Sequence, residues 1–205
     1  KRDREAANAA KGKQSLILGS PWHSLHRLRI DGTTELGTQF TLALYARNTE
    51  NKPARLFSAY RGNHPVNTSE LVFDCDPRGK TIRGLRLICK GIAIESGPAQ
   101  FADGRYHHLA VTYDDGRVHF YLDGRAIGDG YLPGGAPVSL CRDLMVGEDL
   151  ELGTDEQLRG NVDDILVFGR ALTAAQIASL HDKGAEPLIA EGTLQFGEGP
   201  VAARP

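Results

Sequence analysis

The stretch that decides the fold class of this chain is GNVDDILVFGRALT, at residues 160–173. Its central part, 165–168, consists of β-branched, aliphatic and aromatic residues and is too short for a helix core, which indicates a buried strand. Thr173 and Gln176 then show the spacing of a capping box, the pattern that begins a helix. The sequence therefore predicts a buried strand followed at once by a short helix over 174–183.

A pair of adjacent acids, Asp163 and Asp164, stands where this strand begins. Carboxylates at the mouth of a buried strand cost free energy unless hydrogen bonds or a cation compensate their charge. Both residues are therefore candidates for a defined structural or binding role.

Short apolar segments separated by turn signals recur along the rest of the chain. Pairs such as Asp115-Gly116 and Asp123-Gly124 mark tight turns between them. The predicted strands cover 15–19, 27–30, 40–47, 55–60, 70–75, 83–89, 105–113, 117–122, 144–147 and 162–168. Many short strands at this spacing, with one convincing helix, indicate an all-β sandwich or barrel.

The hairpin at 106–124 shows both faces of the predicted sheet. Its two-residue Asp115-Gly116 turn supplies the positive φ angles that a type I′ hairpin requires. Apolar residues that can share one core alternate along one face: Leu109, Val111, Tyr113, Val118, Phe120 and Leu122. The other face carries His108, Ala110, Thr112, His119 and Tyr121. In a two-sheet sandwich we expect that second face to be exposed to solvent or, if it is concave, to form a binding groove.

Three stretches resemble motifs of one known family. Residues 160–173 are similar to the closing strand and helix of laminin-G-like domains in the concanavalin A-like lectin/glucanase superfamily. The segment YHHLAVTYDDGRVHFYLDGR, at 106–125, resembles a second motif of that family, which usually begins Trp-His-His, so that Tyr106 is a departure. A weaker match joins Ile30-Asp31-Gly32 with 40–47. Together the matches run from about residue 28 to 184.

This resemblance implies the fold and a class of function. The expected fold is an all-β, concanavalin A-like jelly-roll sandwich of two antiparallel sheets with one short C-terminal helix, over residues 15–205. Residues 1–14 are expected to be an N-terminal extension or linker. The implied function is non-catalytic binding of carbohydrate or protein, within a larger secreted, periplasmic or cell-surface protein. The alternative is a glycoside hydrolase or polysaccharide lyase with an atypical active site.

The sequence lacks the acid motif of the superfamily's glucanases. Retaining members carry Glu-x-Asp-x-Glu or Glu-x-Asp-x-x-Glu on one strand, a spacing that brings two carboxylates about 5–5.5 Å apart. The nearest acidic cluster, Glu148-Asp149-Leu150-Glu151, does not match and is interpreted as a solvated loop. No Gly-x-Ser-x-Gly elbow is present either. We therefore predict no catalytic residues.

Candidate binding residues follow from the hairpin face and from the resemblance. The predicted ligand-binding residues are the aromatic and imidazole side chains of Tyr60, His108, His119 and Tyr121. Many relatives hold a structural Ca²⁺ with an Asp of the final-strand motif, which implies Asp163, or its neighbour Asp164, as a calcium ligand here. The competing interpretation is that one acid bonds backbone amides while the other faces solvent.

Composition and cysteine usage limit the remaining classes of function. With 24 Lys and Arg against 26 Asp and Glu, the net charge of −2 offers no basic excess for nucleic acid. No apolar run is long enough to cross a membrane. Of the three cysteines, Cys75 and Cys89 flank a predicted hairpin turn. A cross-strand disulfide and two buried thiols are both compatible with that placement.

Overall fold

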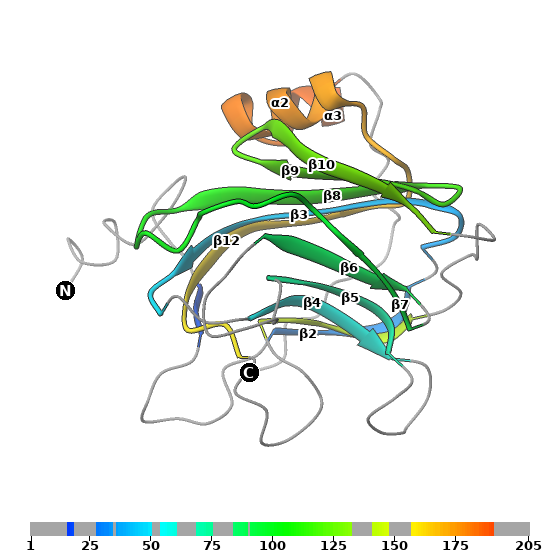
Figure 1. Ribbon diagram of the computed structural model, residues 1–205, viewed down its shortest axis with the longest axis horizontal. Coiled ribbons are helices and arrows are strands. Elements are labelled where there is room, and N and C mark those ends of the chain that lie inside the picture. Colours follow the sequence, from blue (N-terminus) through cyan, green and yellow to red (C-terminus); the bar gives the residue numbers. More distant parts are fainter. Residues whose placement is uncertain are drawn as a thin grey trace.

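The strands pair into two antiparallel sheets that lie face to face. The computed structural model describes residues 16–18, 28–34, 36–50, 54–60, 69–75, 84–89, 91–132, 141–147 and 157–190. Sheet A has the order β1 (Leu16–Leu18), β12 (Gly160–Phe168), β3 (Gln39–Asn48), β8 (His107–Asp114), β9 (Arg117–Leu122) and β10 (Arg125–Tyr131). Sheet B has the order β2 (Leu28–Thr34), β11 (Cys141–Val146), β4 (Arg55–Tyr60), β5 (Ser69–Cys75), β6 (Leu85–Cys89) and β7 (Ile92–Glu95). Figure 1 shows the two layers, with sheet A above sheet B.

The apolar residues that alternate along the strands meet between the layers. The predicted inner face of the β8–β9 hairpin is confirmed, because Leu109, Val111, Tyr113, Val118 and Phe120 are all fully buried. They pack against sheet B residues that include Phe57, Phe73 and Leu87. Burying a side chain of this size stabilises the fold by about 1.5–3 kcal/mol. This core holds the two sheets together.

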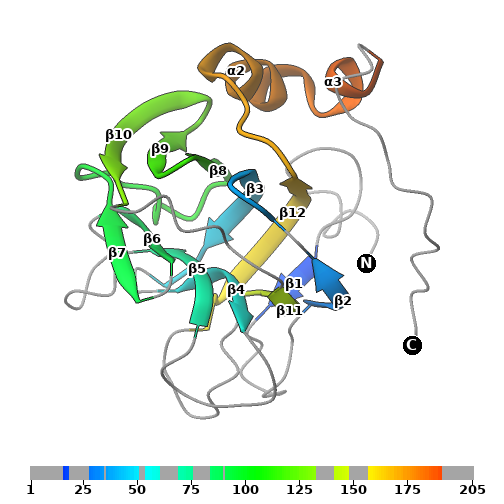
Figure 2. The same ribbon diagram turned by 90° about the vertical axis from the view of Figure 1, so that its right-hand side faces the viewer.

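Two glycines of β10 bring the edges of the two sheets into close contact. A Cβ on Gly128 would lie 2.7 Å from the backbone nitrogen of Gly97, and a Cβ on Gly130 would lie 2.4 Å from a methyl group of Ile94. Both distances are below van der Waals contact, so only glycine fits at these positions. Figure 2 shows β10 and β7 side by side at this edge of the sandwich.

Two helices cover part of the face of sheet A that points away from sheet B. Helix α2 (Ala174–Lys183) begins with the predicted capping box of Thr173 and Gln176. Helix α3 (Glu186–Ala190) follows it. A second apolar cluster joins the helices to the sheet: Ala43, Ala110, Tyr121, Phe168, Leu172, Ile177, Leu180 and Leu188. Both views place the helices on the outer side of sheet A (Figures 1 and 2).

Sequence reasoning missed three elements of the described chain. The strands β7 and β10 are absent from the prediction, and α3 adds a turn of helix after the predicted one. Strand β7 has only four residues, and β10 contains two glycines and no apolar alternation. Both lie at a sheet edge, where neighbouring backbone and not side-chain burial defines the strand. The predicted extension 1–14 lies outside the described residues.

Candidate functional site

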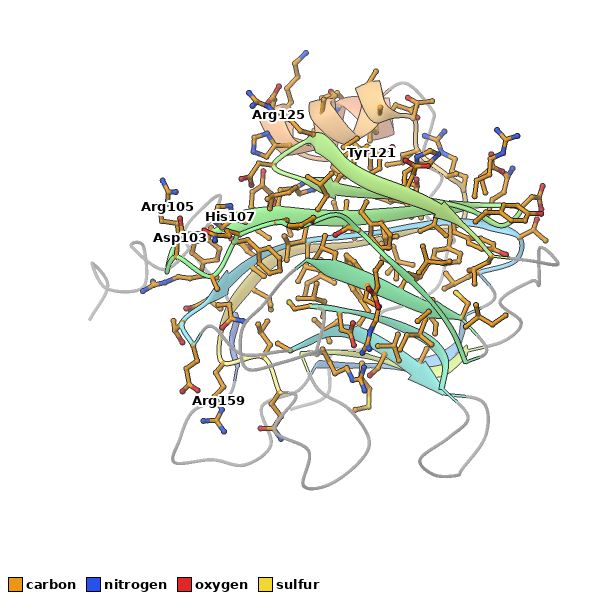
Figure 3. All side chains as sticks on the ribbon, viewed as in Figure 1. Asp103, Arg105, His107, Tyr121, Arg125 and Arg159 are labelled. Atoms are coloured by element: carbon orange, nitrogen blue, oxygen red, sulfur yellow. The ribbon has the colours of Figure 1, made fainter. Side chains whose placement is uncertain are left out.

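A histidine held between two carboxylates lies at one end of sheet A. His107, the first residue of β8, approaches Asp123 with Nδ1 at 2.8 Å and Asp103 with Nε2 at 3.0 Å. Asp123 belongs to the tight turn between β9 and β10, and Asp103 to the loop before β8. Figure 3 shows Asp103, Arg105 and His107 together at this end. The arrangement ties the loop and the turn to the first residue of β8.

Each carboxylate oxygen of this cluster already accepts a hydrogen bond. Asp103 accepts from the backbone and the guanidinium of Arg105, at 2.9 and 2.6 Å, as well as from His107. Asp123 accepts from the backbone N–H of His108 at 2.9 Å with its second oxygen. The side-chain hydrogen bond of Arg105, followed by its backbone N–H and by His107, lowers the pKa of Asp103 below its ordinary value.

Both ring nitrogens of His107 are engaged within this cluster, Nδ1 by Asp123 and Nε2 by Asp103. An imidazole whose two nitrogens both contact carboxylates directs no nitrogen at a further group.

Two of the predicted ligand-binding residues lie beneath α2. His108 is 1 % exposed and Tyr121 is 4 % exposed. The ring of His108 contacts the rings of Tyr45 and His181, with centroids 5.0 and 5.8 Å apart. Figure 3 shows Tyr121 under the helix. The expectation that this part of the face is open was wrong, because the apolar residues of α2 bury it; a contact of either residue with a ligand stays a prediction.

The hydroxyl of Tyr45 fastens the C-terminal turn of α2 to the sheet. It donates a hydrogen bond of 2.7 Å to the backbone carbonyl of His181. Burial, and then the nearby carboxylate of Asp164, raise the pKa of Tyr45. Burial likewise raises the pKa of Tyr121. Both phenols therefore stay neutral at physiological pH, which suits a packed interface.

The other two predicted ligand-binding residues have different positions. His119 is exposed and pairs with Thr112 across the hairpin, and so it does not stand opposite His108. It lies on the part of the outer face that α2 leaves open. The side chain of Tyr60 lies outside the described residues, although its backbone pairs with Arg142 in β11.

The predicted metal ligands Asp163 and Asp164 lie at a bulge in β12. Asp163 pairs with Tyr45 and Leu166 pairs with Ala43, so Asp164 and Ile165 together stand opposite Leu44. Asp164 has a φ of +44°, and its N–H donates to Asp163 Oδ1 at 2.9 Å. After the bulge, the apolar residues of β12 alternate between the core face and the outer face of the sheet.

This pair supplies only part of a calcium site. Calcium takes six to eight oxygen ligands. Among the described residues no group of three or more His, Cys, Asp and Glu side chains is placed to hold a metal ion. Oxygens beyond the two carboxylates would have to complete the shell. Calcium binding at Asp163 and Asp164 therefore stays a prediction.

A buried charge cluster on sheet B was not foreseen. Asp74, which is 1 % exposed, accepts hydrogen bonds from Arg86 at 3.0 and 2.6 Å and also pairs with Arg55. The three residues stand opposite one another on β4, β5 and β6. The two guanidinium groups compensate the charge of the buried carboxylate. Asp74 is therefore part of a structural charge cluster and not a free acid.

The two cysteines of β5 and β6 are free thiols. Cys75 pairs with Leu85 and Cys89 pairs with Leu71, so they lie at opposite ends of the same hairpin. Four residues along a strand correspond to about 13 Å, which is too far for a disulfide. Burial raises the pKa of Cys75. The thiols act as small core residues, one of the two alternatives that the sequence left open.

The fold and these contacts agree with the sequence family. The profile of the concanavalin A-like lectin/glucanases superfamily matches residues 27–178. The chain belongs to this superfamily. The predicted jelly-roll sandwich is thereby confirmed, and no curated protein sequence matches the chain.

Three solved structures show how widely this fold is used. The heptameric SAP-like pentraxin of Limulus polyphemus matches with a TM-score of 0.66 and 18 % identity over 82 % of this chain and 81 % of its own. Domain 4 of AbnA, an extracellular GH43 arabinanase from Geobacillus stearothermophilus solved with arabinotriose, matches with a TM-score of 0.61 and 18 % identity over 85 % of this chain and 79 % of its own. A Trypanosoma rangeli sialidase matches with a TM-score of 0.52 and 19 % identity over 74 % of this chain, but only 23 % of the sialidase. The likeness at these identities concerns the fold.

Among the described segments, no helix is both long and apolar enough to cross a bilayer.

Proposed function

We propose that this domain binds carbohydrate without cleaving it, as a module of a larger extracytoplasmic protein. Support comes from the superfamily and from the arabinotriose-bound domain of AbnA, which has a similar fold. The sialidase is matched over less than a quarter of its length, so a similar sandwich also occurs as one part of an enzyme chain.

The non-catalytic part of the proposal rests on how the carboxylates of Asp103, Asp123 and Asp74 are hydrogen-bonded and paired. Sugar cleavage by two carboxylates requires one acid and one nucleophile or base that face the scissile bond. Asp103 and Asp123 instead face the same imidazole, and all of their carboxylate oxygens accept hydrogen bonds. Asp74 is held by two guanidinium groups. The protein's own hydrogen bonds and ion pairs therefore engage the carboxylates of these acids, which supports binding without cleavage.

A glycan array followed by calorimetric titration tests the proposal. We expect saturable binding of at least one oligosaccharide and no release of reducing ends from a panel of polysaccharides. Turnover that is lost on replacing a carboxylate outside the two clusters would instead establish a hydrolase or lyase. Absence of binding on the array, combined with capture of a purified extracellular protein, would establish a protein-interaction domain.

A further inference from the structure

The part of sheet A that α2 leaves open carries a continuous strip of polar side chains and one aromatic ring. Four residues stand opposite one another across β3, β8, β9 and β10: Gln39, Asp114, Arg117 and Tyr131. His119 and Asp129 form the neighbouring pair one row further in. Asp114 is half-buried, and the other five side chains are exposed. We call this surface the polar strip.

We propose that the polar strip binds a neutral saccharide and that Tyr131 is its stacking platform. The inference rests on the proposed carbohydrate-binding function and adds to it the location of the site and the class of ligand. Nothing in the strip needs to react, because the expected contacts are stacking and hydrogen bonds.

Tyr131 has the properties of a preformed aromatic platform. Its side chain is 58 % exposed, and among the described residues only Tyr131 and Ile92 are large hydrophobic residues with such exposure. The ring leans on the β8–β9 turn, where a Cβ on Gly116 would lie 2.9 Å from Tyr131 Cε2. The backbone beside the ring is fixed by a hydrogen bond of 2.8 Å from Leu132 N–H to the Gly116 carbonyl. An amphipathic ring held in this way loses little entropy on binding.

The neighbours of Tyr131 supply donors and acceptors for sugar hydroxyl groups. Gln39 Nε2 donates to Asp114 Oδ1 at 2.6 Å, which orients both side chains. Arg117 offers only donors and the carboxylates offer only acceptors, whereas a sugar hydroxyl uses both. Adjacent strands lie about 4.8 Å apart, so the row from β3 to β10 spans roughly 14 Å. That length suits a short oligosaccharide lying across the strands.

The charge of the strip selects against anionic sugars. Asp114 and Asp129 belong to it and Asp115 adjoins it, while Arg117 is its guanidinium. Three carboxylates against one guanidinium leave a net negative surface when His119 is neutral. A sulfated or uronic-acid-rich glycan would be repelled there, whereas a neutral saccharide would not.

The strip is also a stable base for recognition. All of its residues lie on strands of one hydrogen-bonded sheet, and the residues between them point into the core, as Phe40, Tyr113 and Val118 do. Binding side chains on strands keep their geometry better than those on loops. The ligand would therefore find the site largely formed.

The test begins with the unmodified protein on an array of neutral and acidic oligosaccharides. The best ligand is then titrated by calorimetry into the parent and into Tyr131→Ala, Tyr131→Phe and Arg117→Ala. Ile92→Ala is the matched control, because Ile92 is 44 % exposed on the edge strand of the other sheet. Melting temperatures within a few degrees of the parent show that each variant is folded.

We expect a neutral saccharide to bind and Tyr131→Ala to weaken it at least tenfold. Tyr131→Phe, which keeps the ring, and Ile92→Ala should stay within threefold of the parent, and Arg117→Ala should weaken binding. If Tyr131→Ala and Arg117→Ala both bind with the affinity of the parent, the polar strip is not the binding site, although carbohydrate binding itself stands. Binding of acidic saccharides alone would overturn the ligand class. A parent that binds no saccharide would overturn the proposed function itself.

Discussion

The hydroxyl of Thr41 donates a hydrogen bond of 2.9 Å to the backbone carbonyl of Arg170, 129 residues further along the chain. The same oxygen accepts from the N–H of Leu172, also at 2.9 Å. Thr41 is fully buried on β3, directly opposite Phe168, the last residue of β12. One side chain of the sheet therefore fixes the segment that leads into α2.

Replacing Thr41 with Val should destabilise the protein by about 2–4 kcal/mol. The substitution removes two buried hydrogen bonds and leaves the carbonyl of Arg170 and the N–H of Leu172 without these partners. Urea denaturation measures the free energy of unfolding, and hydrogen exchange should show reduced protection in α2. Thr41→Ser keeps the hydroxyl and should cost less; a loss for Thr41→Ser as large as that for Thr41→Val would contradict a dominant contribution of the two hydrogen bonds.

Replacing Gly160 with Ala should be among the most damaging single changes. The new Cβ would lie 1.8 Å from the backbone carbonyl oxygen of Arg47, an atom that cannot move without distorting β3. We expect a loss of about 3 kcal/mol or more, seen as a lower melting temperature. Gly169→Ala is the matched control, because nothing lies within 4 Å of its Cβ position. If Gly160→Ala melts at the same temperature as Gly169→Ala, the close approach of Gly160 to the Arg47 carbonyl is refuted.

The hydrogen bonds of Asp103 should make its contribution to stability depend on pH. Because the bonds from Arg105 and His107 lower the pKa of Asp103, this contribution is fully present above the unfolded value of about 4. It is lost as the pH falls through the lower pKa of the folded state. In denaturation series, the stability gap between the parent and Asp103→Asn should thus shrink as the pH falls below about 4. A gap that widens on acidification would contradict this sign.

Calcium binding at the β12 bulge can be tested by thermal shift. If the carboxylates of Asp163 and Asp164 are ligands, calcium should raise the melting temperature of the parent and not that of Asp163→Ala. Magnesium serves as the ionic-strength control. Equal shifts in parent and variant would show that Asp163 does not bind the ion.

The parts of this structure that could be predicted are those that depend on residues close together in the sequence. The strands at the centre of each sheet were found because alternation along residues such as Leu109, Val111 and Tyr113 reports burial directly. The helix start at Thr173 was found because a capping box is local. The partners of His107 could not be foreseen, since Asp103 and Asp123 were recognisable only as turn residues. The charge cluster around Asp74 likewise depends on the register of three strands.

The sequence by itself determined most of the strands, the tight turns and the start of the capped helix, because each of these follows from residues close together in the chain, and it carried the motifs of the superfamily. Only the tertiary structure decided which part of the outer face of sheet A is covered. Helix α2 covers Tyr121 with its apolar side and His108 with the ring of His181, while His119 and Tyr131 stay open. Sequence alternation distinguishes the two faces of a strand, but whether a distant helix packs on one of them depends on contacts between residues far apart in the chain.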